Sequence, residues 1–252
     1  MDLVTGLSNS AYDLAIFGDQ LYLPDFRNNH VNIYHLPDGK IESKIDARMP
    51  HGIATDSGNA VYVCTHRENS LFVFDGQSGS YLQSPYFDHP VSISIDKERF
   101  LIANYGANDT GSIIFSDNQL RSFKLFTRNW AHAKPHSIRI TKRFGVAVAY
   151  RDPPGIVMFD NKGNVVNGIN FSSDFDPLSA VEYRSLLIVP NYYDGNLVCF
   201  NRNLNPVMRL SVGDFLPTNL AIWRDNLIVT EERANRVLII PFRDFYGNHE
   251  SG

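Results

Sequence analysis

Two histidines in the sequence each follow a proline and precede a small residue, as Pro-His-Gly at His51 and Pro-His-Ser at His136. Imidazole is the side chain best suited to acid–base chemistry near neutral pH, and it is also the commonest metal ligand. If the two side chains converge, they form a candidate catalytic or metal-binding pair. A histidine in this place can equally cap a strand or bond its own loop, so both interpretations stay open at this point.

Four oxygen-bearing residues stand at the ends of short apolar runs: Asp25, Asn104, Asn191 and Glu231. A polar side chain in such a place is costly if it is buried without a partner, so the set suggests a solvated or liganded pocket. Carboxylate and amide oxygens are suitable ligands for Ca²⁺. The alternative is that these side chains accept or donate hydrogen bonds to turns.

These residues occupy corresponding positions because the whole chain is built of repeats. Each copy reads as a proline, an alternating apolar run, a polar turn, a second apolar run, a loop and a third run that ends in an aromatic residue. The opening prolines Pro50, Pro90, Pro135, Pro177 and Pro217 are spaced by 40, 45, 42 and 40 residues, and another copy starts 39 residues before the first, at residue 11. That period, with short β-runs between turn residues, predicts an all-β fold, a six-bladed β-propeller with four-stranded blades.

The last repeat lacks a fourth run, and the first repeat is preceded by an unassigned run, Leu3-Val4-Thr5. We therefore expect the N-terminal strand to close the last blade, which also removes an exposed sheet edge. The predicted organisation is a single propeller over residues 1–245, followed by a polar C-terminal tail at 246–252.

Aligning the repeats shows which residues share a place on the ring. The residue after each opening position starts the inner strand and is expected at one mouth of the central channel, and the end of the second strand returns to the same rim. The six residues at the first of these positions are Tyr12, His51, Val91, His136, Leu178 and Thr218. We expect His51 and His136 to face one another across that mouth, with Asp25, Asn104, Asn191 and Glu231 around them.

The second repeat, with its Pro-His-Gly-Ile-Ala-x-Asp opening and its Asn-Ser-Leu-Phe-Val-Phe-Asp strand, resembles NHL repeats. Together with Tyr105 in Asn-Tyr-Gly and Arg151 in Tyr-Arg-Asp, the two Pro-His motifs are similar to peptidylglycine amidating lyase. That resemblance implies zinc-binding roles for His51 and His136 and catalytic roles for Tyr105 and Arg151. The chain departs from the family at Thr218, where the third zinc-binding histidine would stand, and it lacks the family's disulfides.

Two further resemblances concern the oxygen-bearing residues. The strand that contains Glu231, Val-Thr-Glu-Glu-Arg-Ala-Asn-Arg-Val, is similar to the Thr-Glu-x-x-x-Asn-Lys strand of virginiamycin B lyase, which implies a chemical role for Glu231. The chain also resembles calcium-dependent gluconolactonases, which bind metal through Glu, Asn and Asp around the channel. That resemblance implies Ca²⁺ binding by Asp25, Asn104, Asn191 and Glu231, although the family's spacing motifs are not reproduced.

Composition excludes several classes of protein. The net charge is −4 and the pI is about 6.0, which argues against a nucleic-acid partner. No apolar run is long enough to span a membrane, so we expect no membrane partner, and a protein that is cytoplasmic or else secreted with its signal peptide removed. The two cysteines, Cys64 and Cys199, lie in apolar runs of different repeats and are predicted to be buried free thiols.

Three functions follow, and the sequence favours the first over the other two. The first is a lyase or hydrolase that acts on a small molecule or short peptide at the channel mouth, with a divalent metal, zinc or calcium, as a candidate cofactor. The second is an NHL-type interaction module that presents its loop face to a peptide or protein. The third is a calcium-dependent, lactonase-like hydrolase.

Overall fold

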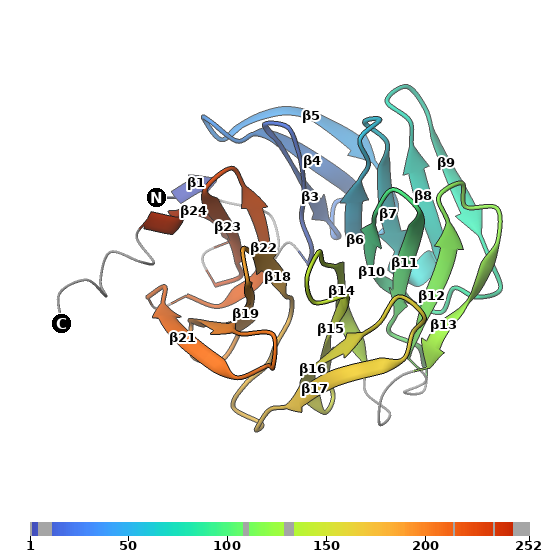
Figure 1. Ribbon diagram of the computed structural model, residues 1–252. Coiled ribbons are helices and arrows are strands. Elements are labelled where there is room, and N and C mark those ends of the chain that lie inside the picture. The colour runs from blue at the N-terminus through green and yellow to red at the C-terminus, as the bar shows by residue number, and fades with distance from the viewer. Residues whose placement is uncertain are drawn as a thin grey trace.

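Each predicted repeat forms one four-stranded antiparallel sheet in the computed structural model, and six sheets stand as blades around a central channel (Figure 1). The structure describes residues 2–4, 12–107, 111–128, 134–213, 215–233 and 235–243. The predicted all-β, six-bladed propeller is therefore confirmed, and the predicted tail at 246–252 lies outside the described residues.

In blades 1 to 5 the four strands follow one another from the channel outward. Blade 1 consists of β2 (Ala15–Phe17), β3 (Gln20–Asp25), β4 (His30–His35) and β5 (Lys40–Asp46). Blade 2 consists of β6 (Pro50–Thr55), β7 (Val61–Thr65), β8 (Ser70–Phe74) and β9 (Gly79–Gln83), with a short 3-10 turn η1 (His66–Glu68) after β7. Blade 3 consists of β10 (Pro90–Ile95), β11 (Arg99–Asn104), β12 (Ser112–Asp117) and β13 (Phe123–Arg128).

The second half of the ring repeats this order. Blade 4 consists of β14 (Pro135–Ile140), β15 (Val146–Arg151), β16 (Pro154–Phe159) and β17 (Val165–Asn170). Blade 5 consists of β18 (Val181–Tyr183), β19 (Leu186–Asn191), β20 (Asn196–Phe200) and β21 (Pro206–Ser211). Blade 6 consists of β22 (Pro217–Trp223), β23 (Asn226–Glu231), β24 (Arg236–Pro241) and β1 (Asp2–Val4).

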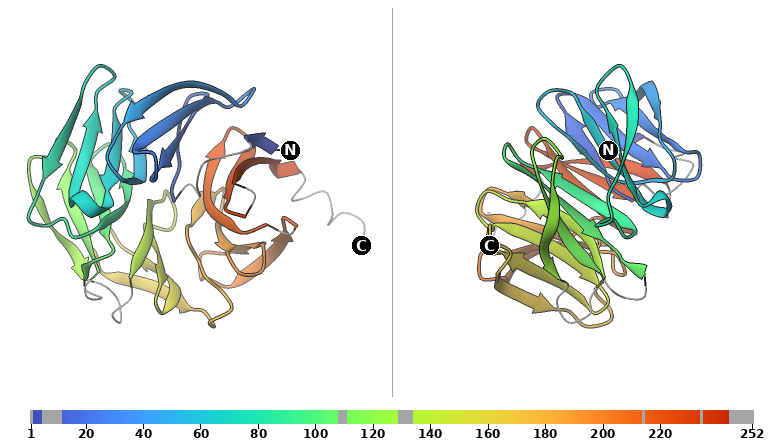
Figure 2. Two further views of the ribbon diagram at one scale, coloured as in Figure 1. Left: turned by 180° about the vertical axis from the view of Figure 1, so that it is seen from behind. Right: turned by 90° about the vertical axis from the view of Figure 1, so that its right-hand side faces the viewer.

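The first strand closes the ring, as the sequence predicts. β1 pairs antiparallel with β24, with Asp2 opposite Leu238 and Val4 opposite Val237. In Figures 1 and 2 the blue first strand lies beside the red last one. A hydrophobic cluster joins blade 6 to blade 1, because Ile228 and Val237 of blade 6 pack with Leu21 of blade 1. Blade 6 is thus completed by the opposite end of the chain.

The core lies between neighbouring blades, because alternate residues of each strand face the next sheet. Leu101 of β11 and Val148 of β15, for example, belong to one buried cluster between blades 3 and 4. Cys64 and Cys199 are both buried and free, which confirms the prediction for the thiols. They lie in blades 2 and 5, on opposite sides of the ring.

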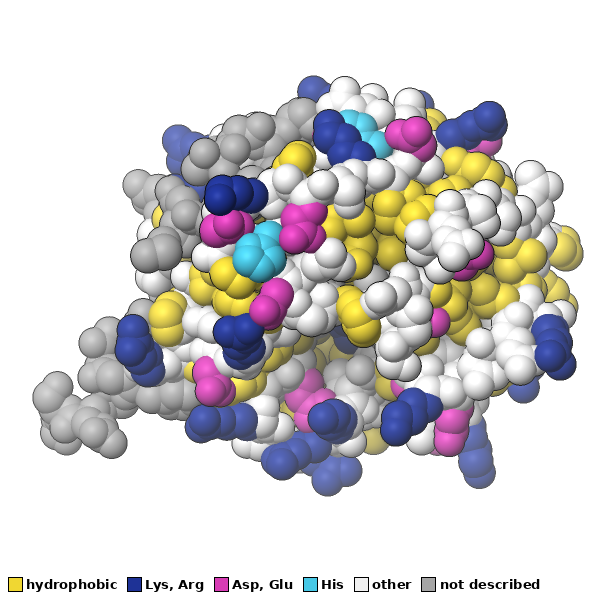
Figure 3. Space-filling view, turned by 90° about the horizontal axis from the view of Figure 1, so that it is seen from above, with side chains coloured by type: hydrophobic (Ala, Val, Ile, Leu, Met, Phe, Trp, Pro, Cys, Tyr) yellow, Lys and Arg dark blue, Asp and Glu magenta, His cyan; other side chains and the backbone are white. Residues whose placement is uncertain are grey.

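Surface charge and helix length are the two features that bear on the predicted absence of nucleic-acid and membrane partners. On the side of the molecule seen in Figure 3, Lys and Arg side chains stand among Asp and Glu side chains. Within the described ranges, no helix has the length and apolar character needed to cross a membrane. The absence of a nucleic-acid or membrane partner stays a prediction.

Candidate functional site

Backbone pairing fixes the height of the predicted site on the ring. The first residue of the inner strand pairs with the end of the second strand, as Pro50 does with Thr65 and Pro217 with Glu231. The next residue along the inner strand then faces one mouth of the channel. All six residues at this position line two adjoining cavities there, and we call them the inner ring: Tyr12, His51, Val91, His136, Leu178 and Thr218.

A second ring of side chains surrounds the inner one. Its members each stand one residue beyond the polar strand-end position, where the second strand turns into the third. We call them the outer ring: Phe26, His66, Tyr105, Arg151, Tyr192 and Glu232. The structure therefore brings His51, His136, Tyr105 and Arg151 together at one mouth, as the sequence predicts, and adds His66, to which the sequence assigned no role.

The mouth has two lobes. The histidine lobe, of about 260 Å³, is lined mainly by His51, His66, Phe26, Arg67 and Tyr105. The glutamate lobe, of about 170 Å³, is lined mainly by Leu178, Tyr192, Thr218, Asn219 and Glu232. Three residues line both lobes and so form their junction: Tyr12, His136 and Arg151.

Both predicted histidines are held in one tautomer by the neighbouring blade. The Nδ1 atom of His51 lies 2.8 Å from the carbonyl oxygen of Val91, and Nδ1 of His136 lies 2.9 Å from that of Leu178. A carbonyl oxygen only accepts hydrogen bonds, so Nδ1 carries the proton in both rings and Nε2 keeps its lone pair. Among the described residues, no hydrogen bond engages Nε2 of either ring.

The two imidazoles are close to each other and to a tyrosine ring. The ring centroids of His51 and His136 are 6.2 Å apart, and Tyr12 stacks on His51 at 4.5 Å with an interplanar angle of 13°. The residue after His51 must be glycine for a steric reason, because a Cβ atom on Gly52 would lie 2.4 Å from the carbonyl oxygen of Val91. The Pro-His-Gly motif thus allows the close blade contact that orients the histidine.

Burial keeps these imidazoles neutral. It lowers the pKa of His51 to about 3, with smaller contributions from the neighbouring His136 and His66. Burial is also the main cause that lowers the pKa of His136, and it lowers the pKa of His66 to about 4 with help from nearby His89. At neutral pH the mouth therefore offers unprotonated ring nitrogens, which can accept a proton.

We expect this burial to make the fold sensitive to mild acid. The unfolded chain binds a proton at His51 near its ordinary pKa of 6.5, whereas the folded chain resists protonation until about pH 3. Stability is therefore complete above pH 6.5 and is lost as the pH falls through this window, by about 2 kcal/mol for this one group between pH 6.5 and 5. Urea unfolding at pH 7 and pH 5 should show a smaller loss for His51→Gln than for the unaltered chain. Equal losses in the two proteins would contradict this account.

Arg151 is oriented by a carboxylate that sequence analysis missed. Its Nε atom lies 3.0 Å from Oδ2 of Asp176, which is 2% exposed and comes from the next blade. Burial raises the pKa of Asp176, while Arg151 and His136 act against that rise. Asp152 is adjacent to Arg151 in the sequence, but the ion pair is with Asp176. The feature of the sequence that could have identified Asp176 is its position directly before the repeat proline Pro177.

The four polar strand-end residues hold loops. Asn191, for instance, accepts the backbone N–H groups of Asp176 and Tyr193 through Oδ1. Glu231 likewise accepts the N–H groups of Leu216 and Arg233 through Oε1. Asp25 accepts the backbone N–H and the side-chain amide of Asn28, whereas Asn104 donates Nδ2 to the backbone oxygen of Tyr86 and to the hydroxyl of Ser112. Strand alternation explains this placement, because the residue one step further along the strand is the one that faces the mouth.

In the part of the chain that the structure describes, the donors form no three-ligand metal centre. Throughout the described ranges, no group of three or more His, Cys, Asp or Glu side chains is arranged to hold a metal ion. The assignment of His51, His136, Asp25, Asn104 and Asn191 as metal ligands, and of Glu231 as a catalytic residue, stays a prediction.

An ion pair crosses the channel below the mouth. Asp13 of blade 1 accepts a hydrogen bond from Nη2 of Arg139 of blade 4, and these two blades stand opposite each other in the ring. Asp13 is 2% exposed, and its Oδ2 atom also lies 3.3 Å from the hydroxyl of Ser92. This pair forms the floor beneath the inner ring.

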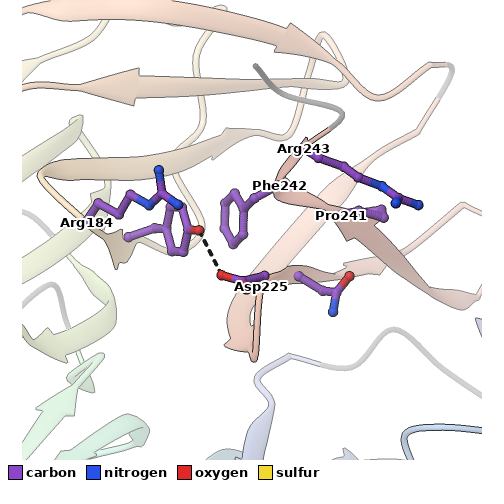
Figure 4. Close-up of a pocket in the computed structure, with 7 residues that line it drawn as sticks. Arg184, Asp225, Pro241, Phe242 and Arg243 are labelled. Atoms are coloured by element: carbon purple, nitrogen blue, oxygen red, sulfur yellow. Dashed lines mark hydrogen bonds between the residues drawn. The ribbon is translucent and has the colours of Figure 1, made fainter. Parts of the chain in front are cut away.

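A larger cavity, of about 470 Å³, lies on the opposite face, where β24 leaves the ring (Figure 4). Tyr183 and Phe242 stack there with ring centroids 3.4 Å apart, and the tyrosine hydroxyl lies 3.3 Å from Oδ1 of Asp225. Both rings belong to the core cluster between blades 5 and 6. We place the candidate site at the other mouth, where two imidazoles lie near the guanidinium of Arg151. The two rings of this cavity, Tyr183 and Phe242, are instead part of the core packing.

Comparisons with known proteins support the fold. No protein-family model and no curated protein sequence matches the chain. Among solved structures, a gluconolactonase, XC5397 from Xanthomonas campestris, is similar with a TM-score of 0.80 and 13% identity, over 95% of this chain and 88% of that one.

Two further structures share the architecture. An H270A variant of virginiamycin B lyase from Staphylococcus aureus, solved with quinupristin, has a TM-score of 0.71 and 10% identity, over 89% of this chain and 78% of that one. A chain of a nidogen/laminin complex has a TM-score of 0.68 and 13% identity, over 79% of each chain. At the level of fold, the chain is a six-bladed propeller that resembles virginiamycin B lyase, gluconolactonase and a chain of the nidogen/laminin complex.

Proposed function

We propose that the protein is an enzyme of the lyase or hydrolase class that acts on a small molecule or short peptide at this mouth. The observation that carries the proposal is the meeting of two neutral imidazoles, each with a lone pair on Nε2, with the guanidinium of Arg151. A general base needs a neutral nitrogen within reach of the proton it takes. His136 is the best candidate, because it lines both lobes beside Arg151.

The proposed chemistry needs three roles. Nε2 of His136 takes a proton from the substrate or from a water molecule, which begins an elimination or a hydrolysis. Arg151, held through Nε by Asp176, presents its Nη groups to an anionic group of the substrate and stabilises negative charge as it develops. Tyr105, in the histidine lobe, donates a proton to the leaving group.

The proposal is tested by turnover rather than by binding. The protein is incubated with lactones, carboxylate-bearing esters and compounds that can undergo β-elimination, and the mixtures are followed by proton NMR. We expect turnover of at least one class, with kcat lowered by about 10²–10⁴-fold in His136→Gln, the range typical of a general base. The control is His35→Gln, which changes an exposed imidazole at the far end of β4.

The opposite outcome is also informative. If compounds bind at the mouth and are recovered unchanged, and if His136→Gln binds them equally well, the protein is a binding module. The fold it shares with a chain of the nidogen/laminin complex would then be the relevant precedent. Lactone turnover that survives His136→Gln but requires added Ca²⁺ would favour the calcium-dependent lactonase alternative.

A further inference from the structure

The two lobes of the mouth differ in charge. In the histidine lobe the charged side chains are the guanidinium groups of Arg67 and Arg151, since the buried imidazoles are neutral. Arg67 lies over the ring of Phe26, with its Cζ atom 5.9 Å from the ring centroid. Lys134 lies 5.2 Å from the ring centroid of Tyr105, which adds a further cation at the rim.

Aromatic rings form much of the same lobe. Tyr12, Phe26 and Tyr105 all line it, and Tyr12 is 36% exposed. Flat apolar surface beside guanidinium groups suits a ligand that carries an anionic group on an aromatic or other flat apolar body.

The glutamate lobe shares the guanidinium of Arg151 but differs from the histidine lobe because it also presents hydrogen-bond acceptors. Glu232 supplies a carboxylate, and a hydrogen bond with that carboxylate is one cause that raises the pKa of Tyr192 to about 12, after burial. The tyrosine hydroxyl is therefore a donor to Glu232, and the carboxylate keeps further acceptor capacity.

A buried amide oxygen at the base of the glutamate lobe points to a missing partner. Asn219 is 1% exposed and donates Nδ2 to the backbone oxygen of Tyr12, which fixes the orientation of its amide. Its Oδ1 atom is buried and has no hydrogen-bond partner within the part of the chain that the structure describes. A buried acceptor of this kind is costly unless a ligand or water donates to it. An N–H group of a ligand would satisfy it.

From this polarity we infer that the mouth binds a small dipolar molecule, with a cationic amine in the glutamate lobe and an anionic group on a flat apolar body in the histidine lobe. The inference names a substrate class for the proposed enzyme and, as a statement about substrates, rests on that function. Because His136 and Arg151 line both lobes, the bond that reacts lies between the amine and the anionic group.

The test measures the binding of matched probes to the 252-residue chain. Gly-Phe carries both charges and an aromatic ring, N-acetyl-Gly-Phe lacks the ammonium group, and Gly-Phe amide lacks the carboxylate. Calorimetry should give a Kd for Gly-Phe at least about tenfold lower than for either derivative, the scale expected when a charged hydrogen bond is lost.

Variants assign each charge to its lobe. Glu232→Gln should raise the Kd of Gly-Phe and bring the Kd of N-acetyl-Gly-Phe level with it. Arg67→Gln should likewise bring the Kd of Gly-Phe amide level with that of Gly-Phe. Glu98→Gln and Arg202→Gln, which change exposed charges in hairpins at the opposite face, serve as controls and should leave all three Kd values unchanged.

The outcomes separate this inference from the proposed function. If Gly-Phe amide and N-acetyl-Gly-Phe bind as well as Gly-Phe, or if Glu232→Gln leaves the acetylation penalty intact, the dipolar inference is wrong. In that case, turnover that depends on His136 would still support the proposed enzymatic function. If Gly-Phe binds selectively but no compound in the panel is turned over, the dipolar-ligand inference is supported and the proposed enzymatic function is wrong.

Discussion

A chain that lacks residues 1–7 is expected to melt on the order of 10 °C below the 252-residue chain, or to aggregate. The deletion removes β1 and with it the antiparallel pairing to β24. The backbone groups of β24 then form an open sheet edge, which is a template for pairing with another molecule. A loss of about 3 kcal/mol corresponds to roughly 6–12 °C in a protein of this size.

Differential scanning calorimetry and light scattering measure the two effects together. The control removes residues 246–252, the polar tail predicted from the sequence, and should leave the melting temperature unchanged. If the chain that starts at residue 8 melts within about 2 °C of the 252-residue chain and does not aggregate, closure by β1 contributes little to stability.

Closure, blade number and strand order could all be predicted because each depends on spacing along the chain. A proline every 40 to 45 residues marks where an inner strand begins, and the missing fourth run in the last repeat identifies the strand that must replace it. Such patterns arise from local backbone geometry and alternating burial, which one sequence displays directly.

The site was predicted less completely, because it depends on the direction of single side chains. Counting along the repeat located the rim correctly but selected the strand-end residue, such as Asn191, which bonds to loops. One step further along, Tyr192 faces the mouth. The same shift by one residue would have identified His66 from Thr65, because adjacent strand residues point to opposite faces.

Side-chain contacts between different blades could not be predicted from the sequence. Arg151 and Asp176 belong to different repeats, and nothing in their spacing selects this pair over the adjacent Asp152. The channel floor is a stronger case, because Asp13 and Arg139 are 126 residues apart and meet only when the ring closes. Pairing of this kind depends on the width of the channel and on which blades face each other.

The contact between Asp13 and Arg139 gives the other large expected effect. Arg139→Met should lower the free energy of unfolding by about 3–5 kcal/mol, because it leaves the carboxylate of Asp13, 2% exposed, without its cationic partner. The double variant Asp13→Asn/Arg139→Met removes both charges and should recover a large part of the loss. Urea unfolding at neutral pH measures both differences.

The matched control is Arg224→Met, which breaks an ion pair with Asp19 at the surface, where the two side chains are 64% and 40% exposed. Because water solvates both partners when that pair is broken, its loss should cost less than about 1 kcal/mol. Equal losses in Arg139→Met and Arg224→Met would mean that the buried pair contributes no more than the exposed one. A double variant no more stable than Arg139→Met would show that the guanidinium stabilises the channel by packing, rather than by neutralising Asp13.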